Sequence, residues 1–288
     1  MNGILIVDKP KGYTSRDVVN SIERLANTKK VGHGGTLDPI ATGVLVVALG
    51  NGLKVLEFLS DQDKEYIATV KMGIETNTLD ITGEVTKKKD FFFLDAVKLD
   101  EVLKSFVGKY NQEVPLYSSV KVGGQRLYKY ARENTPVELP KREVNIYSLE
   151  LLASKNDEFI IKANVSKGTY IRSLIRDIGE KLGIPCTMKE LRRTRQGDFV
   201  IDEAVSIEQL ESGIIKPLPI EKALKNIIFV PADEDLEKKI MNGAILDNIY
   251  AEKMVGFKNL KNEVIAIYKV YDKDITKIKP LKVFKNIE

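Results

Sequence analysis

The sequence Gly32-His33-Gly34-Gly35-Thr36-Leu37-Asp38-Pro39-Ile40-Ala41-Thr42-Gly43-Val44-Leu45 places one carboxylate, that of Asp38, in a loop of glycines, a proline and small residues. Glycine lets a backbone approach a ligand closely and adopt positive φ. The apolar run from Val44 to Leu49 follows the loop and predicts a buried strand. An acidic side chain between such a loop and a core strand is well placed to act on a substrate, although a structural turn with a capping aspartate also fits the composition.

Further segments accompany this loop along the chain. The first is Val7-Asp8-Lys9-Pro10-Lys11-Gly12-Tyr13-Thr14-Ser15, near the N-terminus. The others, in order, are Asp63-Lys64-Glu65-Tyr66, Val114-Pro115-Leu116-Tyr117-Ser118-Ser119-Val120-Lys121, Gly124 with Tyr128, Ala131 and Arg132, Ser166-Lys167-Gly168-Thr169-Tyr170-Ile171-Arg172-Ser173-Leu174, and Leu191-Arg192-Arg193-Thr194-Arg195-Gln196-Gly197. Together with the Asp38 loop they closely resemble the motifs of the TruB family of tRNA pseudouridine synthases, in its bacterial stand-alone branch. One such segment is a weak signal, whereas several in the family's order are a strong one.

The resemblance implies an α+β fold with two domains. Residues 1–225 are expected to form a pseudouridine synthase catalytic domain, with a central mixed or antiparallel sheet flanked by helices. Residues 114–145 show no clear period, and we interpret them as an RNA-gripping surface insertion. Pro217 and Pro219 mark the boundary, and residues 228–288 are similar to the small β-rich PUA domain that binds RNA in many members of the family.

Local patterns predict the individual elements. Thr14 or Ser15 can cap a helix that runs to about Leu25, and Asp95 can cap another that runs to Phe106. The Lys87-Lys88-Lys89 run is interpreted as a solvated loop. The remaining expected helices are 53–59, 169–182, 207–211, 220–224 and 235–241, and the remaining expected strands are 3–7, 66–72, 159–165, 227–230, 264–270 and 278–284.

The composition and the absence of certain motifs limit the kinds of reaction that this protein can catalyse. A single cysteine, Cys186, excludes an internal disulfide, and a single histidine, His33, leaves no zinc site of the usual His/Cys kind. The sequence has no Gly-x-x-x-x-Gly-Lys-Ser/Thr loop, no apolar run of membrane-spanning length and no signal-peptide pattern. We therefore expect a cytoplasmic protein that contacts no membrane and whose reaction uses carboxylate, tyrosine and arginine, with no metal and no cofactor.

Basic side chains are unevenly distributed, although the net charge is only +4. Residues 167–195 contain eight basic residues against three acidic ones, and residues 121–142 contain six against two. Tyr128, Tyr130 and Tyr170 are interleaved with them. This mixture suits a polyanion with exposed bases, while ordinary solvated helix faces are the alternative.

The resemblance assigns roles to individual residues. Asp38 matches the attacking aspartate, with attack on the base or on ribose C1′ left open, and Arg172 matches the arginine that pairs with it. Tyr66 matches a tyrosine that stacks on the base and accepts the C5 proton, or only stacks. The expected substrate-binding residues are His33, Tyr170, Leu191, Lys9, Lys121, Arg132 and Arg193. Core packing is the alternative for His33 and for the pocket-wall residues.

The substrate implied by the resemblance is the uridine at position 55 in the T loop of tRNA. We expect the chain to act as a monomer, with no guide RNA and no protein partner. A non-catalytic RNA-binding or RNA-folding protein on the same scaffold is one alternative, and the presence of Asp38, Tyr66 and Arg172 argues against it. A carboxylate enzyme such as a glycosidase is another, and Asp80 is the candidate for the second carboxylate that it needs.

Overall fold

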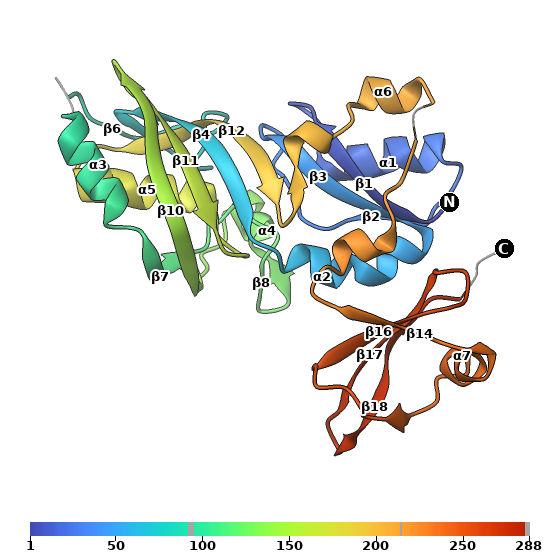
Figure 1. The fold of residues 1–288 in the computed structure, drawn as a ribbon. Helices are drawn as coiled ribbons and strands as arrows, with labels where there is room; N and C mark the ends of the chain where they lie inside the picture. The colour runs from blue at the N-terminus through green and yellow to red at the C-terminus, as the bar shows by residue number, and fades with distance from the viewer. Residues whose placement is uncertain (92–94, 214, 286–288) are drawn as a thin grey trace.

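The computed structural model describes residues 1–91, 95–213 and 215–285. Figure 1 shows two groups of strands and helices side by side, with a smaller C-terminal group against one of them. One nine-stranded sheet runs through both larger groups in the order β1-β3-β12-β4-β11-β10-β7, with β2 paired to β3 and β13 paired to β12. The fold is therefore mixed α+β, as expected, with a β-rich C-terminal piece.

The first group contains β1 (Gly3–Lys9), β2 (Val31–His33) and β3 (Thr42–Leu49). β3 is buried from Gly43 to Leu49, which confirms the strand predicted from its apolar run. α1 (Ser15–Leu25) has Thr14 as its N-cap, which is one of the two caps predicted, and Thr14 and Asp17 form a capping box in which each side chain bonds to the other's backbone amide. A 3₁₀ turn over Gly50–Val55 and α2 (Leu56–Ser60) follow β3.

The second group contains the strands β4 (Lys64–Met72), β7 (Gly108–Glu113), β10 (Lys141–Lys155) and β11 (Glu158–Val165). α3 (Ala96–Lys104) and α5 (Ile171–Leu182) pack against this part of the sheet (Figure 1). In β4 the even-numbered residues are buried and the odd-numbered ones are half-buried, which is the period of a strand with one covered face. α5 ends at Gly183 in the left-handed conformation, at φ 70°.

The long strand β12 (Cys186–Gln196) joins the two groups. It runs antiparallel to β4 and, at Arg192 and Arg193, parallel to β3. Gly43 allows this close approach: it has φ 100°, and a Cβ there would lie 2.2 Å from the carbonyl oxygen of Arg193. The end of the Asp38 loop is thereby fixed against the arginine-rich part of β12.

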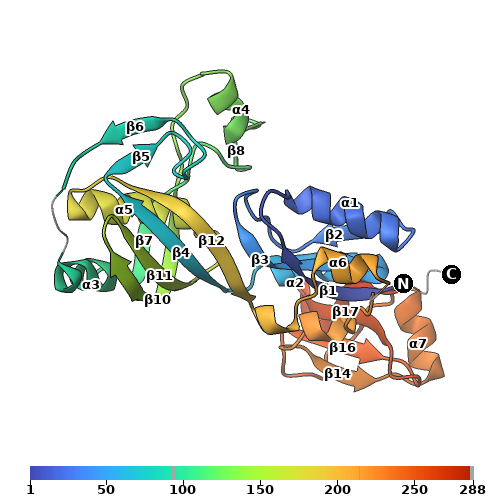
Figure 2. The same ribbon diagram turned by 90° about the horizontal axis from the view of Figure 1, so that it is seen from above.

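The β5–β6 hairpin and the insertion, which contains the β8–β9 hairpin, project on one side of the sheet (Figure 2). β5 (Ile74–Thr76) pairs with β6 (Val85–Lys88), and β8 (Lys121–Val122) pairs with β9 (Gln125–Arg126), which leads into α4 (Leu127–Arg132). The expectation of a loop at Lys87–Lys89 is wrong for its first two residues. They belong to β6, where pairing to β5 satisfies the backbone while the side chains stay exposed.

The C-terminal part begins after β13 (Phe199–Val200), a 3₁₀ turn at Ile201–Glu203, α6 (Ile207–Glu211) and a further 3₁₀ turn at Ile220–Ala223. Its five-stranded sheet has the order β14-β16-β17-β18-β15. The elements are β14 (Ile228–Pro231), α7 (Glu234–Met241), β15 (Leu246–Asp247), β16 (Met254–Lys258), β17 (Val264–Tyr271) and β18 (Asp274–Val283). The last three residues of the expected domain 228–288 lie outside the described residues.

This C-terminal part is tied to the first group by apolar and polar contacts. Ile267 and Phe284 belong to the same buried cluster as Ile4 and Val46. Lys54 Nζ also donates to the carbonyl oxygen of Val283 at 2.6 Å. In the described part of the chain, no helix is long and apolar enough to cross a membrane.

Candidate active site

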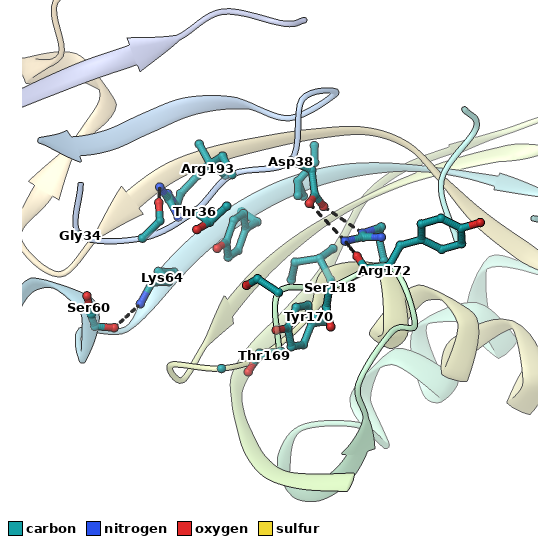
Figure 3. Close-up of a pocket in the computed structure, with 18 of the residues that line it drawn as sticks. Gly34, Thr36, Asp38, Ser60, Lys64, Ser118, Thr169, Tyr170, Arg172 and Arg193 are labelled. Carbon is teal, nitrogen blue, oxygen red and sulfur yellow. Dashed lines mark hydrogen bonds and ion pairs between the residues drawn. The ribbon is translucent and has the colours of Figure 1, made fainter. Parts of the chain in front are cut away.

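A pocket of about 400 Å³ opens where the two groups of the sheet meet. Its walls come from four places: the Asp38 loop, the start of β4, the insertion around Ser118, and the turn into α5 (Figure 3). Leu191 and Arg193 of β12 and Ser60 of α2 complete the lining. Segments far apart in sequence therefore converge on one cavity, and the expected residues Asp38, Tyr66, Tyr170 and Arg172 are all among those that line it.

Asp38 and Arg172 form a two-point ion pair in this pocket. Arg172 Nε lies 2.9 Å from Asp38 Oδ2, and Nη2 lies 3.2 Å from Oδ1. Arg172 Nη1 donates to the carbonyl oxygen of Thr78 at 2.9 Å, and Nη2 also donates to that of Tyr117 at 3.1 Å. The Arg172 side chain is only 6% exposed, whereas that of Asp38 is 34% exposed. The guanidinium is thus fixed in place, and it holds a carboxylate that still faces the open pocket.

Asp80, the candidate second carboxylate of a glycosidase, is not part of this site. Its Oδ1 accepts hydrogen bonds from Thr78 Oγ1 at 2.9 Å and from the Thr82 amide at 3.0 Å. It does not line the pocket. Asp80 is therefore a structural turn residue, and its loop serves the site by presenting the Thr78 carbonyl to Arg172.

Aromatic and aliphatic side chains form the apolar walls. Tyr66 and Leu191 are each 7% exposed and line the cavity, as does Tyr170. Burial raises the pKa of the Tyr170 hydroxyl, so this side chain stays neutral. Ser118 Oγ lies at the same wall and, in the described part of the chain, is buried without a hydrogen-bond partner.

Gln112 of β7 fixes the backbone of Tyr170 from outside the pocket. Its Oε1 accepts from the Tyr170 amide at 2.8 Å, and its Nε2 donates to the Tyr170 carbonyl at 3.1 Å. The Gln112 residue is 1% exposed. A side-chain amide therefore pairs with the peptide as a neighbouring strand would, two residues before the arginine that holds Asp38.

Two residues expected to bind substrate lie elsewhere. Lys9 is fully buried, and its Nζ donates to the carbonyl oxygens of Pro10 at 2.9 Å, Tyr13 at 2.6 Å and Pro39 at 3.4 Å. Because Lys9 neither reaches solvent nor lines the pocket, the expectation that it binds substrate is wrong, and its side chain instead holds the backbone at Pro39, next to Asp38. Burial lowers its pKa to about 8.

His33 lies in β2 and is absent from the pocket lining. Burial, helped by the charges of Arg193 and Arg16, lowers its pKa and favours the neutral ring. Its Nδ1 is buried with no hydrogen-bond partner among the described residues. In this structure the side chain is a half-buried neighbour of the pocket.

The other expected basic residues divide into two kinds. Arg193 lines the pocket and is 1% exposed. Lys121 in β8 and Arg132 in α4 are exposed, and Arg132 lies over the ring of Tyr128 at 5.5 Å. Tyr128 itself lines the pocket. The insertion therefore places exposed positive charge beside the opening.

Several lining residues received no role from the sequence. Ser118, Thr169 and Lys64 line the pocket. Each belongs to one of the quoted motifs, but the sequence gives none of them a role of its own. The strand period offered a signal for Lys64, because residues 64 and 66 of β4 share one face.

Among the described residues, no group of three or more His, Cys, Asp or Glu side chains is arranged to hold a metal ion.

Comparisons with solved structures show which known folds this chain resembles. A structure of an H/ACA RNP bound to a substrate RNA containing 2′-deoxyuridine matches with a TM-score of 0.72 and 28% identity, over 99% of this chain and 85% of that one. A crystal structure of a Cbf5–Nop10–Gar1 complex matches with a TM-score of 0.71 and 30% identity, over 98% and 84%. The fold of this chain is therefore similar, over nearly its full length, to that of one chain in each of these complexes.

Comparisons of sequence are more specific. Curated relatives named tRNA pseudouridine synthase B are 41% identical in Staphylococcus aureus (strain MSSA476), over 98% of this chain and 99% of the relative, and 42% identical in Oceanobacillus iheyensis, over 99% and 98%. Residues 23–171 match the N-terminal domain of TruB family pseudouridylate synthases, and residues 172–237 match the tRNA pseudouridylate synthase B C-terminal domain. The fold and these relatives define a pseudouridine synthase. The chain belongs to the TruB family.

Proposed function

We propose that this protein converts uridine to pseudouridine at position 55 in the T loop of tRNA, with Asp38 as the attacking group. The observation that supports this best is the Asp38 carboxylate, which is held by both nitrogens of the Arg172 fork and is open to a pocket. The relatives named tRNA pseudouridine synthase B, 41–42% identical over nearly the whole chain, support tRNA as the substrate.

The reaction rearranges bonds within one nucleotide. The N1–C1′ bond of uridine breaks, the base turns, and C5 forms the new bond to C1′. The proton at C5 is lost and N1 gains one, so the product is an isomer of the substrate. Asp38 supplies the attacking oxygen, and Arg172 holds the carboxylate in one orientation before it attacks.

The target base has to leave its stack to reach this pocket. Tyr66, Tyr170 and Leu191 provide walls between which a flipped base can lie. Stacking on an aromatic ring is worth roughly 1–3 kcal/mol per base and offsets part of the cost of flipping. The Tyr66 hydroxyl is the proposed acceptor of the C5 proton.

RNA binding outside the pocket is assigned to exposed basic residues of the insertion. Lys121 and Arg132 are exposed, and Arg132 lies over the ring of the pocket residue Tyr128; both are proposed to contact phosphates of the T arm. Residues 1–225 are proposed as the catalytic domain and residues 228–288 as a PUA-like domain that adds RNA contacts. The protein is proposed to act as a monomer, with neither a guide RNA nor a protein partner.

The test is incubation with unmodified tRNA, followed by carbodiimide mapping of pseudouridine along the molecule. We expect one modified position, in the T loop, and none with the Asp38→Asn variant. Modification at other positions only would contradict the assigned site. Tight tRNA binding without any pseudouridine would instead favour the non-catalytic RNA-binding alternative.

A further inference from the structure

The pocket has two electrically different ends. At one end Asp38 and Arg172 neutralise each other. At the other end lie Lys64 and Arg193 (Figure 3), and within the described chain neither forms an ion pair with a carboxylate. Two cations with so little exposure, 8% for Lys64 and 1% for Arg193, are costly to keep without a counter-charge.

The hydrogen bonds of Lys64 leave part of its ammonium group available. Nζ donates to the carbonyl oxygens of Ser60 at 3.1 Å and Gln62 at 2.5 Å, which uses two of its three protons. The nearest carboxylates have other partners: Asp61 binds Lys167 at 2.9 Å, and Asp63 accepts from the Tyr147 hydroxyl at 3.0 Å. Burial, with help from the charge of Arg193, lowers the pKa of Lys64 to about 8.

Arg193 joins the loop before Asp38 to this cationic end. Its Nε donates to the carbonyl oxygen of Val44 at 2.6 Å, and its Nη2 to that of Gly35 at 3.0 Å. The next residue, Thr36, also lines the pocket. In the chain as described, the backbone amides of Gly35 and Thr36 have no hydrogen-bond partner, so they add two unused donors near the cations.

We propose that Lys64, backed by the charge of Arg193, binds a phosphate of the flipped nucleotide. This inference rests on the proposed function, because it takes the occupant of the pocket to be a nucleotide. A nucleotide has one anionic group, its phosphate, and the base must reach the Asp38 end for chemistry. The cationic end of the same cavity then receives the phosphate, which supplies the missing counter-charge and fixes the ribose between the two ends.

A purely structural role for Lys64 makes a different prediction. If the ammonium group only ties the carbonyls of Ser60 and Gln62, its removal lowers the thermal stability and acts equally on every RNA. If the ammonium group binds a phosphate of the RNA, Lys64→Met removes the charge that binds it and keeps the aliphatic part of the side chain. The carbonyls of Ser60 and Gln62 lose a donor in either case, so the two roles are distinguished by whether the loss of activity depends on the RNA phosphates.

The experiment is a double-substitution cycle on the full chain. The substrates are a T-arm stem-loop and the same RNA with a single neutral methylphosphonate on the 5′ or the 3′ side of the target uridine. The quantity measured is kcat/KM for pseudouridine formation. We expect Lys64→Met to lower it at least about 10-fold on the unmodified RNA, and one of the two methylphosphonates to lower it similarly for the parent protein. When Lys64→Met is combined with that methylphosphonate, kcat/KM should fall no further than it does with either change alone.

Lys167→Met is the matched control, because Lys167 is an exposed lysine whose partner is Asp61. The fold-decrease in kcat/KM caused by Lys167→Met should multiply with the fold-decrease caused by each methylphosphonate. Losses for Lys64→Met that multiply in the same way with both methylphosphonates would overturn the phosphate site. A parent protein that forms no pseudouridine in the stem-loop or in whole tRNA contradicts the proposed function itself, which separates the two failures.

Discussion

Arg172 binds both carboxylate oxygens of Asp38, through Nε at 2.9 Å and Nη2 at 3.2 Å, although the two residues are 134 positions apart in the chain. The arginine lies in the first turn of α5, and the aspartate lies in the loop before β3. The relationship therefore depends on the two groups of the sheet being fixed against each other at β12.

Arg172→Lys tests the geometry of this pair. A lysine keeps the charge but offers no planar two-bond fork, and it leaves the carbonyls of Thr78 and Tyr117 without their donor. We expect kcat to fall about 10- to 100-fold, while the affinity for RNA changes little because phosphate contacts dominate it. Single-turnover kinetics and a filter-binding titration measure the two quantities. Nearly full activity in Arg172→Lys would remove the need for the fork.

Tyr66→Phe separates stacking from proton transfer. Phenylalanine keeps the aromatic face in the pocket wall and loses only the hydroxyl group. RNA binding should stay within about 3-fold of the parent, whereas product formation should slow at least about 10-fold. Tyr66→Leu, which also loses the ring, should weaken binding as well. A fast Tyr66→Phe enzyme would reduce the tyrosine to a stacking platform.

Gln112→Ala tests how the pocket wall is positioned. Without Gln112, the amide and the carbonyl of Tyr170 lose their partners, at a cost in the free energy of unfolding of about 1–3 kcal/mol. We expect kcat/KM to fall about 10-fold at a temperature where the variant is fully folded. Gln125→Ala is the control, because Gln125 binds Glu133 in the insertion. Unchanged kinetics in a destabilised Gln112→Ala would make the glutamine purely structural.

The pH dependence of kcat/KM tests the charge of Lys64. Its pKa in the free protein is about 8, so the side chain is protonated and attracts phosphate below this pH and becomes neutral above it. We expect kcat/KM to decline as the pH rises from about 7 to about 8.5, because this parameter reports the ionisation of the free enzyme. In Lys64→Arg, whose guanidinium stays charged, the decline should disappear. A decline identical in the parent and in Lys64→Arg would assign it to another group, such as Lys9.

Elements whose signals are local could be predicted from the sequence. The helix cap at Thr14, the apolar run of β3 and the end of α5 at Leu182 each depend on residues that are close in the sequence, and the structure confirms all three predictions. β12 was not expected as a strand, because Arg192, Arg193 and Arg195 interrupt its apolar pattern. Their charges are accommodated by distant partners: Asp8 binds Arg192 at 2.8 Å, and the carbonyl of Val44 accepts from Arg193.

In the candidate site, too, features with a local sequence signal could be predicted, whereas contacts between distant residues could not. Asp38 could be singled out from its own loop, while its link to Arg172 came only from resemblance, since no local pattern encodes a contact over 134 positions. Lys9 shows how a charged residue in a motif is misread. The resemblance implied that Lys9 binds substrate, yet three backbone carbonyls bind its ammonium group inside the protein, where lysine is rarely found without such partners.

The most direct test of the central claim measures tritium release from T-arm RNA labelled as [5-³H]uridine at the target position. Isomerisation replaces the C5–H bond by the new bond to C1′, so each turnover releases one tritium, whereas binding or hydrolysis of the glycosidic bond releases none. We predict complete release by the parent protein and none above background by Asp38→Asn, with both proteins folded and bound to the RNA. Release by Asp38→Asn at more than about one hundredth of the parent rate, a difference of about 3 kcal/mol in the barrier, would contradict Asp38 as the attacking group. No release by the parent would contradict the isomerase itself.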